Sequence, residues 1–566
     1  MKLPQRPKRF IVIPRPSTPA VAPTSLQTMR LMHLGPRLPA KAAVAKKAAP
    51  AAASRAARAA TPTVSYGTPV KVVNRSPADG ALLLEPQDHV TLDRLKAQAP
   101  QGAKVLEEQW YSLERPARPW STQSATLKKP RLRAGHTVTW SVTVVLDGGQ
   151  RRRLPDALVT VMTDEDKGIG VEGTTNRYGK ASFVLSDKTK RVDAIYVDPL
   201  HSGWPMRLAK VLVVPGGVEI AVVPIDLAVA DARGTVYGKP AAGSGKTVRV
   251  AVVDTGVGPH SALRVKRGLN TTAAESGRRF RDEDGHGSHV AGVIASAAAG
   301  WRRGEASAVE LHAYRIFESG DPYASSFAIG AAIKDAANQG CDLVNLSIGD
   351  SMADDGIRDA VEFAWARGCV CIAATGNDSK GQVDYPARYT QAVAVSAIGL
   401  IGSWPAGTYL DWTLSASRGK GLGGQESFLA SFSNRGAKVA LTAPGVGVVS
   451  TIFASRWGVM SGTSVATPIA TGVLARRLAA SPAVKDLPRD AARSAEIVKM
   501  ALQAAEDIRW RRPCRAGADP GPRAQAAGAL QGARCAGGSC QGLDSGRPGF
   551  ESRSAMPRLH PSGCKS

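Results

Sequence analysis

The sequence has few cysteines, few aromatic residues and no long uninterrupted apolar segment. Its seven cysteines are an odd number in a chain of 566 residues, which excludes a disulfide framework as the main support of the fold. Aromatic residues make up only 5% of the chain, but hydrophobic residues make up 43%, which is enough for folded domains. The best candidate for a membrane span, residues 211–230, is interrupted by two prolines and two acidic residues and cannot serve as one.

Acidic residues are scarce at the two ends of the sequence. Residues 1–60 hold twelve Lys and Arg and no Asp or Glu, and residues 508–566 hold ten basic and three acidic residues. These two segments contribute 19 of the formal net charge of +26, so the body of the chain is close to neutral. We therefore expect nucleic-acid binding, if it occurs, to be non-specific and to involve the basic ends.

The amino-terminal region lacks the pattern of a signal peptide, because Phe10–Ile13 is its only apolar run. A cytoplasmic location is the default expectation, and secretion is the alternative if the true start of the protein differs. The sequence leaves the oligomeric state open.

Composition and periodicity predict five regions along the chain. Three of them are biased or short, and two are expected to be folded domains of different class. They are a disordered basic Pro/Ala-rich segment (1–65), a short α+β segment (66–120), a small β-sandwich (135–215), an α/β domain (242–507) and a basic low-complexity tail (508–566).

The β-sandwich prediction rests on short β-branched segments separated by Gly and Asp turns. Thr137–Leu146 is such a segment, and the turn at Asn176–Gly179 is expected to close a hairpin with Ala181–Leu185. The turn from Thr175 to Ala181 resembles one in the carboxypeptidase-regulatory-like β-sandwich, a resemblance that implies nothing catalytic.

In the α/β region, short apolar segments alternate with helical ones. Such alternation predicts right-handed crossovers and a doubly wound parallel sheet. The expected strands are 248–253, 311–317, 342–348, 369–374 and 392–398, and the expected helices are 289–299, 326–338 and 356–367.

Three polar residues stand at the ends of these elements, where α/β folds place active sites. Asp254 follows the first strand, His286 precedes a helix in Asp-Gly-His-Gly-Ser-His, and Ser464 begins another helix in Ser-Gly-Thr-Ser-Val-Ala. A serine hydroxyl becomes a useful nucleophile when an imidazole accepts its proton, and the imidazole needs a carboxylate to orient it. The three residues therefore predict nucleophilic acyl transfer.

The order and the surroundings of these three residues resemble those of the subtilisin-like (subtilase, peptidase S8) serine endopeptidases. The resemblance covers roughly residues 245–480 and implies Asp254 as orienting residue, His286 as general base and acid, and Ser464 as nucleophile. Ala373–Asn377 resembles the family's oxyanion-hole segment, which implies that the Asn377 amide donates to the oxyanion. Val344–Gly349 resembles the strand that binds substrate backbone, which implies substrate contacts at Ser347, Ile348 and Gly349.

The resemblance implies proteolysis of protein or peptide substrates through an acyl-enzyme, without a cofactor or a metal in the chemistry. A structural calcium ion is left open, although a solvated acidic loop is favoured for Asp282–Asp284. His289 and the thiols of Cys369 and Cys371 are expected to be buried and inert. Because family members often carry a propeptide, residues 66–120 are interpreted as propeptide-like, with self-processing upstream of Gly243.

Three alternatives remain. The chain could be a catalytically silent peptide-binding protein on the same scaffold, or a nucleic-acid-associated protein that binds through its basic ends. An acid peptidase of the sedolisin type is disfavoured because it would have glutamate in the role of His286.

Overall fold

In the computed structural model of the protein, the chain divides into two compact units, residues 2–109 and 110–566. Each unit is described by itself. The structure describes residues 6–14, 70–86, 90–113, 127–148, 151–379, 381–415, 418–422, 425–503, 505–507, 510–511, 525–526 and 553–554.

The first unit is a four-stranded antiparallel sheet with one helix, α1 (Leu92–Gln98). The prediction of disorder over residues 1–65 is wrong at Phe10–Ile13, which forms β1 between β3 and β4. The side chains of Phe10 and Val12 are buried in the core of this sheet, and their burial stabilises the strand. The Pro/Ala-rich composition of the surrounding sequence does not indicate this strand. The strand order is β2 (Val70–Arg75), β3 (Leu82–Pro86), β1 and β4 (Lys104–Glu107).

Residues 137–222 form two four-stranded sheets that enclose one apolar core. The predicted hairpin at Asn176–Gly179 is wrong, because β9 pairs with β8 in one sheet and β10 pairs with β6 in the other. The turn therefore carries the chain across the core. The likeness to a carboxypeptidase-regulatory-like domain stays a prediction. The strands are β6 (Thr137–Leu146), β7 (Arg152–Arg153), β10 (Lys180–Ser186) and β13 (Val218–Val222) in one sheet, and β8 (Leu158–Asp164), β9 (Ile169–Thr174), β11 (Arg191–Asp198) and β12 (Met206–Leu212) in the other.

The larger domain is built on seven consecutive parallel strands, which confirms the predicted doubly wound α/β fold. Short apolar segments form these strands because both faces of the sheet are covered. In sheet order they are β15 (Val265–Asn270), β16 (Glu310–Arg315), β14 (Arg249–Asp254), β18 (Leu343–Leu346), β20 (Val370–Ala374), β21 (Ala392–Leu400) and β24 (Leu441–Pro444).

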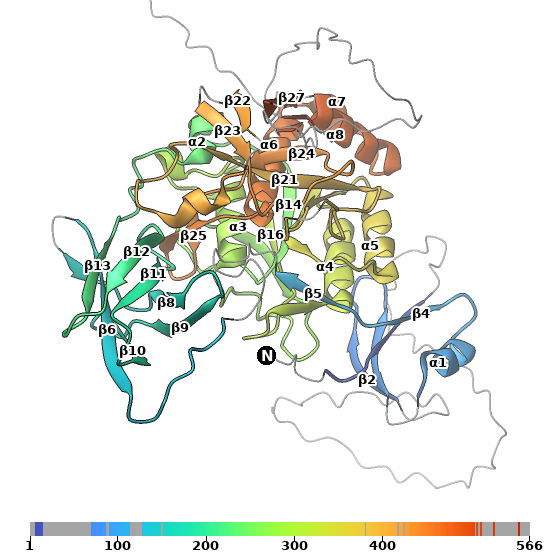
Figure 1. Ribbon diagram of the computed structural model, residues 1–566. Coiled ribbons are helices and arrows are strands. Elements are labelled where there is room, and N and C mark those ends of the chain that lie inside the picture. The colour runs from blue at the N-terminus through green and yellow to red at the C-terminus, as the bar shows by residue number, and fades with distance from the viewer. Residues whose placement is uncertain are drawn as a thin grey trace, which may run out of the picture. The chain divides into compact units, whose positions relative to one another are not determined.

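Helices cover the two faces of this sheet (Figure 1). Alternate residues of β14 show the division, since Val250 and Val252 join one core cluster and Ala251 and Val253 join the other. The first cluster contains α3 (His286–Ala295), α6 (Thr463–Ala479) and α8 (Ala491–Gln503), and the second contains α4 (Ser326–Asn338) and α5 (Asp355–Trp365).

Shorter strands surround the parallel core. Two of them form a hairpin that leads into the helix carrying Ser464. The remaining elements are β5 (Trp110–Leu113), α2 (Ala232–Tyr237), β17 (Tyr323–Ser325), β19 (Ile348–Gly349), β22 (Arg418–Leu422), β23 (Gln425–Leu429), the hairpin of β25 (Val448–Ile452) and β26 (Arg456–Met460), α7 (Pro482–Lys485), β27 (Glu506–Asp507), β28 (Trp510–Arg511), β29 (Gln525–Ala526) and β30 (Arg553–Ser554), with 3-10 turns at Gly300–Arg302 and Tyr409–Thr413.

The sandwich is joined to the α/β domain by apolar and polar contacts. Trp204, from the β11–β12 connection, is 7% exposed and belongs to the core cluster of the α/β domain. Nearby, the Ser202 N–H donates to the Trp457 carbonyl at 3.0 Å. Further along, α2 contributes Ala232, Val236 and Tyr237 to the same core, so this domain begins upstream of the predicted boundary at residue 242.

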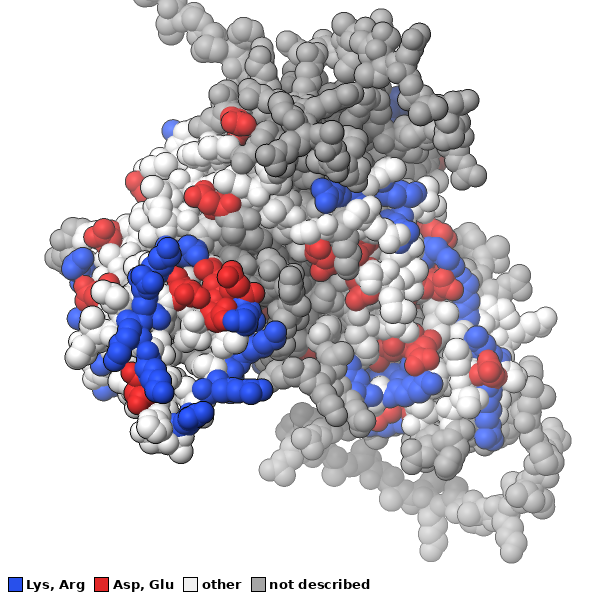
Figure 2. Space-filling model, in the orientation of Figure 1, with Lys and Arg blue, Asp and Glu red and all other residues white. Residues whose placement is uncertain are grey.

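Charged side chains of both signs are interspersed on the visible face of the described residues (Figure 2). The expected concentration of positive charge in residues 1–60 and 508–566 lies mostly outside the described residues. None of the described helices is both long enough and apolar enough to span a bilayer.

We predict that Trp204→Ala destabilises the whole α/β domain, although Trp204 is contributed from outside it. Removing a buried aromatic side chain costs about 3–5 kcal/mol, through lost burial and the cavity left behind. The melting temperature, measured by circular dichroism, should fall by several degrees. The matched control Tyr178→Ala, in a side chain that is 61% exposed, should change it little. Equal effects of the two substitutions would contradict the packing role of Trp204.

Candidate active site

The Asp254 and His286 side chains meet at the carboxyl-terminal edge of the parallel sheet. Asp254 is the last residue of β14 and His286 is the first residue of α3. His286 Nδ1 lies 2.8 Å from Asp254 Oδ1, and both side chains are almost fully buried. Because the carboxylate is an acceptor, Nδ1 is assigned the proton, and Nε2 keeps its lone pair.

His286 Nε2 is buried and has no hydrogen-bond partner among the described residues. The Ser464 hydroxyl is therefore not bonded to it in this structure. Looser contacts between nucleophile and base are common in enzymes without substrate. The arrangement leaves a basic nitrogen, with its partner carboxylate in place, ready to accept a proton.

Gly287 permits the close approach of α3 to the end of β14. A Cβ atom at this position would lie 2.1 Å from the Gly256 carbonyl oxygen and 3.1 Å from Asp254 Oδ1. Its N–H donates to Thr255 Oγ1 at 2.9 Å. The glycine after the histidine is thus required by packing against the strand that carries the carboxylate.

Asp282 organises the loop before His286. The prediction of a solvated acidic loop at Asp282–Asp284 is therefore wrong for Asp282, whereas Glu283 and Asp284 are exposed. Asp282 is 4% exposed, and its oxygens accept hydrogen bonds from the N–H groups of Asp284, Gly285 and Ser288 and from the Thr255 hydroxyl. Burial raises the pKa of this carboxyl, and the hydrogen bonds oppose that rise. No group of metal-ligating side chains occurs among the described residues.

Ser464 lies in the first turn of α6, a helix of 17 residues. Gly462 precedes the helix with φ near 150°, a conformation that side chains disfavour. Ser347 Oγ donates to the Ser464 carbonyl at 2.8 Å, and Asn345 Nδ2 donates to Ser347 Oγ at 2.9 Å. The end of β18 is thereby tied to the start of α6.

Asn377 lies beside the same helix start. Its Oδ1 accepts from the Thr463 N–H at 2.8 Å and from the Thr463 hydroxyl at 3.0 Å. Since the amide is planar, this orientation turns Nδ2 away from Thr463. Gly376, with φ of 103°, makes the turn, and a Cβ atom there would lie 2.2 Å from Asn434 Nδ2 and from Asp384 Oδ2.

The edge formed by Ile348 and Gly349 is occupied by another part of the chain. Strand β5 pairs antiparallel with β19, with Leu113 opposite Ile348 and Ser112 opposite Gly349. On its other side β5 pairs with β17, with Ser112 opposite Tyr323. The predicted substrate-binding edge therefore holds an extended peptide from more than 200 positions earlier in the sequence.

The seven predicted site residues lie near the carboxyl-terminal edge of the parallel sheet. They are at or after strand ends (Asp254, Ser347 and Asn377), at helix starts (His286 and Ser464) or in the short strand β19 (Ile348 and Gly349). The Ser347 hydroxyl donates to the Ser464 carbonyl, and the substrate contact expected of Ser347 stays a prediction. The sequence patterns did not indicate Thr463 or Asn345, and they indicated Asp282 only as part of a solvated acidic loop. Thr463 stands directly before Ser464 and could have been found from that position, whereas the contacts of the other two depend on the fold.

His289, Cys369 and Cys371 are buried, as predicted. His289 Nε2 lies 3.0 Å from the Val448 carbonyl, while the buried Nδ1 has no hydrogen-bond partner in the part of the chain that the structure describes. Burial lowers the pKa of His289 to about 3. A protonated ring would bury an unpaired N–H and a charge, so His289 is a neutral core residue.

A buried carboxylate–imidazole pair at the edge of a doubly wound sheet, together with a serine as the second residue of a helix at the same edge, is typical of the class of serine hydrolases. Residues 245–517 match the model of the subtilase family. Subtilisin Savinase of Lederbergia lenta is 35% identical over 234 residues, which cover 41% of this chain and 76% of that protein. The chain belongs to the subtilase family.

Other relatives match this chain over a longer stretch. M-protease of Shouchella clausii (strain KSM-K16) is 34% identical over 286 residues, which are 50% of this chain and 65% of the relative, just under two thirds of its length. Among solved structures, Sphericase is 26% identical with a TM-score of 0.40, covering 49% of this chain and 90% of its own. S41 Psychrophilic Protease is 28% identical with a TM-score of 0.39, covering 49% and 89%.

We predict that His289 makes the protein less stable in acid. The unfolded chain binds a proton near pH 6.5, whereas the folded chain does so only near pH 3. Stability is therefore complete above pH 6.5 and falls as the pH drops, by about 1.4 kcal/mol per pH unit from this group. In melting experiments from pH 7 to 4, His289→Gln should show a shallower decline. An unchanged slope in His289→Gln would contradict the prediction.

Proposed function

We propose that the protein is a serine endopeptidase that hydrolyses peptide bonds of protein or peptide substrates through an acyl-enzyme. The observation that carries the proposal is the 2.8 Å contact between His286 Nδ1 and Asp254 Oδ1, with Nε2 left without a partner among the described residues. Membership of the subtilase family supports it. The chemistry needs protein groups only.

In the proposed reaction, Ser464 Oγ attacks the carbonyl carbon of the scissile bond while its proton moves to His286 Nε2. Asp254 stabilises the imidazolium that forms. The tetrahedral intermediate then collapses, the C–N bond breaks, and the leaving amine takes the proton from His286. Water repeats the sequence on the ester and releases the carboxylic acid and free Ser464.

The negative charge on the tetrahedral oxygen would be stabilised by the Asn377 amide and the Ser464 N–H. The orientation of Asn377, set by its two contacts with Thr463, supports this role. The position of Ser464 in the first turn of α6 adds an unpaired helix N–H and a favourable dipole. Such donors are effective because they are already in place before charge develops.

The proposed substrate is an extended peptide that adds a strand between β17 and β19. Strand β5 already has this arrangement, which supports the interpretation of the region before it as propeptide-like. In the proposed precursor, the chain's own segment occupies the substrate-binding edge. Cleavage on its carboxyl side would separate it from the sandwich, which would remain on the mature enzyme through contacts such as that of Trp204.

The endopeptidase proposal predicts covalent labelling of Ser464 by a fluorophosphonate probe at neutral pH. Wild type should be labelled and Ser464→Ala should not, because only an activated hydroxyl attacks the probe. The matched control Ser351→Ala, in an exposed serine, should be labelled like wild type. Absence of labelling in folded wild type, judged by circular dichroism, would favour the catalytically silent alternative.

The propeptide-like proposal predicts a new amino terminus between Leu113 and Thr137, downstream of β5 and upstream of the sandwich. Intact mass and amino-terminal sequencing of the purified chain should detect it in wild type. Ser464→Ala should keep its full length, because the nucleophile is lost. A labelled, active wild type with the same mass as Ser464→Ala would contradict self-processing and leave the endopeptidase proposal intact.

A further inference from the structure

The hairpin of β25 and β26 packs against the helix that carries the proposed base. Ser450 Oγ donates to the His289 carbonyl at 2.8 Å, and Thr451 Oγ1 donates to the Ser288 carbonyl at 2.8 Å. Both carbonyls belong to the first turn of α3, which begins at His286. Strand β25 is therefore bound directly to the start of this helix.

The same hairpin leads into the helix that carries the proposed nucleophile. Strand β26 ends at Met460, and α6 begins three residues later at Thr463, with Ser464 as its second residue. Within this short link, the Gly462 N–H donates to the Gly445 carbonyl at 2.8 Å. A movement of the hairpin relative to α3 would therefore change the distance between base and nucleophile.

A buried ion pair binds β25 at Val449. Asp231 Oδ2 accepts from the Val449 N–H at 2.9 Å, and Arg302 Nη1 donates to the Val449 carbonyl at 3.4 Å. The two charged groups are 3.1 Å apart, and the side chains of Arg302 and Asp231 are 3% and 0% exposed. The ion pair thus satisfies both backbone groups of Val449, as an adjacent strand would do.

Both members of the pair are bound to the linker between the sandwich and α2 (residues 223–231). Asp231 ends the linker as the N-cap residue of α2, and its Oδ1 accepts a hydrogen bond from that helix. Arg302 donates to the carbonyls of Leu227 and Val229. The linker precedes the residues that match the subtilase model, so the hairpin is held by a part of the chain that this model does not cover.

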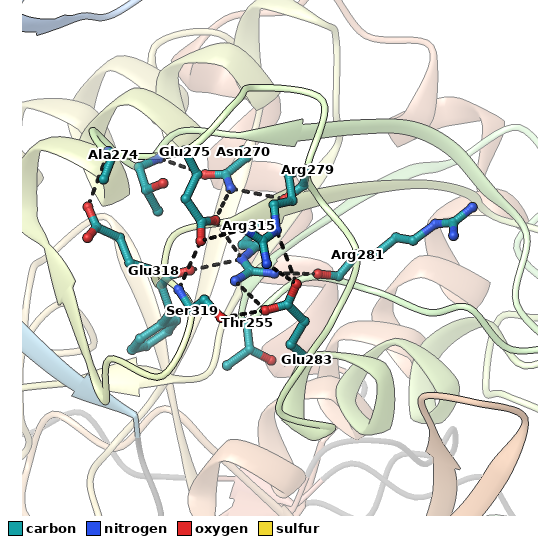
Figure 3. Close-up of polar contacts among 12 residues, drawn as sticks. Thr255, Asn270, Ala274, Glu275, Arg279, Arg281, Glu283, Arg315, Glu318 and Ser319 are labelled. Carbon is teal, nitrogen blue, oxygen red and sulfur yellow. Dashed lines mark hydrogen bonds and ion pairs between the residues drawn. The ribbon is translucent and has the colours of Figure 1, made fainter.

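A different buried guanidinium holds the loop before His286 (Figure 3). Arg315 is 2% exposed, donates to the Arg281 carbonyl at 2.7 Å and pairs with Glu283 at 3.2 Å. The position of the proposed base thus has supports that do not involve Arg302. Loss of Arg302 would therefore act mainly on the hairpin and on the helix into which it leads.

We propose that Asp231 and Arg302 are positioning residues of the proposed active site, which hold the hairpin so that Ser464 comes within reach of His286. The inference deepens the proposed function and rests on it. Both residues act through the backbone of β25. A misplacement of reacting groups by about 1 Å can slow the chemical step about a hundredfold, so a contact at this distance from the chemistry can control the rate. The mature enzyme would accordingly need the linker as well as the domain that the family model matches.

The test compares Arg302→Met with wild type, both as full chains. Active sites are counted by fluorophosphonate labelling, and cleavage of quenched fluorescent casein is measured per labelled site. We expect kcat to fall about ten- to a hundredfold, because the nucleophile is misplaced. KM should stay within about twofold, because the substrate-binding edge at β19 is not contacted by the pair. The pH profile should keep its shape, because the contact between Asp254 and His286 is retained.

Arg493→Met is the matched control. Arg493 is 1% exposed and pairs with Asp342 at 2.6 Å, directly before the start of β18 and thus at the opposite edge of the sheet. Both substitutions should lower the melting temperature, because each removes a buried guanidinium from an ion pair. Only Arg302→Met should lower kcat.

Two milder variants keep the test decisive if Arg302→Met does not fold. Arg302→Lys retains the charge and one donor, and Asp231→Asn retains an acceptor for the Val449 N–H. Each should lower kcat about three- to tenfold with KM unchanged, and Arg302→Lys should remain more active than Arg302→Met wherever both fold.

The outcomes separate this inference from the proposed function. Wild-type kcat in folded Arg302→Met, or in both milder variants, would overturn the positioning role and leave the endopeptidase proposal intact. Equal falls of kcat in Arg302→Met and Arg493→Met would do the same, because they would indicate a general loss of stability. Folded wild type that neither takes the label nor cleaves casein would overturn the endopeptidase proposal, and the positioning role with it.

Discussion

The buried contact between Asp254 and His286 sets the geometry on which the rest of the site depends. Removing a carboxylate and an imidazole from water is costly, and the 2.8 Å hydrogen bond between them compensates for part of that cost. His286 Nε2 and Asp254 Oδ2 have no hydrogen-bond partner among the described residues. For the bond between the two residues to form, α3 must begin within reach of the end of β14. Gly287 allows that approach, and Asp282 holds the intervening loop by its backbone N–H groups. Structural residues with no proposed chemical role therefore decide where the proposed base lies.

A second set of contacts fixes the start of α6 relative to the same sheet edge. Ser347 joins the end of β18 to the Ser464 carbonyl, and Asn377, after β20, joins the Thr463 N–H. Because β14, β18 and β20 are parallel neighbours, their carboxyl ends lie at one edge, and each supplies one component of the site. The parallel sheet thus brings three residues that are distant in the sequence close together in space.

Much of this could be predicted from sequence because the relevant signals are local. A short apolar run such as residues 248–253 predicts a buried strand by itself, and the helix at 326–338 was predicted with the bounds that the structure has. The features that were wrong or missed depend on pairing between distant segments. Residues 10–13 become a strand only by pairing with β3 and β4, and the turn at 176–179 resembles a hairpin turn although its flanking strands enter different sheets. The burial of Asp282 likewise depends on donors that the fold brings to it.

The pairing of β5 follows from a general constraint on sheet edges. The facing edges of β17 and β19 present backbone N–H and C=O groups that need partners, and an exposed pair of edges invites association with any extended peptide. In the structure the chain supplies that peptide itself, with Tyr111 buried and its hydroxyl donating to the Met352 carbonyl at 3.1 Å. The same backbone groups that would bind a substrate strand are satisfied internally, so substrate binding must replace these bonds with equivalent ones. In the proposed exchange the backbone pairing would contribute almost equally to both complexes, so the difference in binding free energy between substrate and internal strand would come from the side chains, at positions such as that of Leu113.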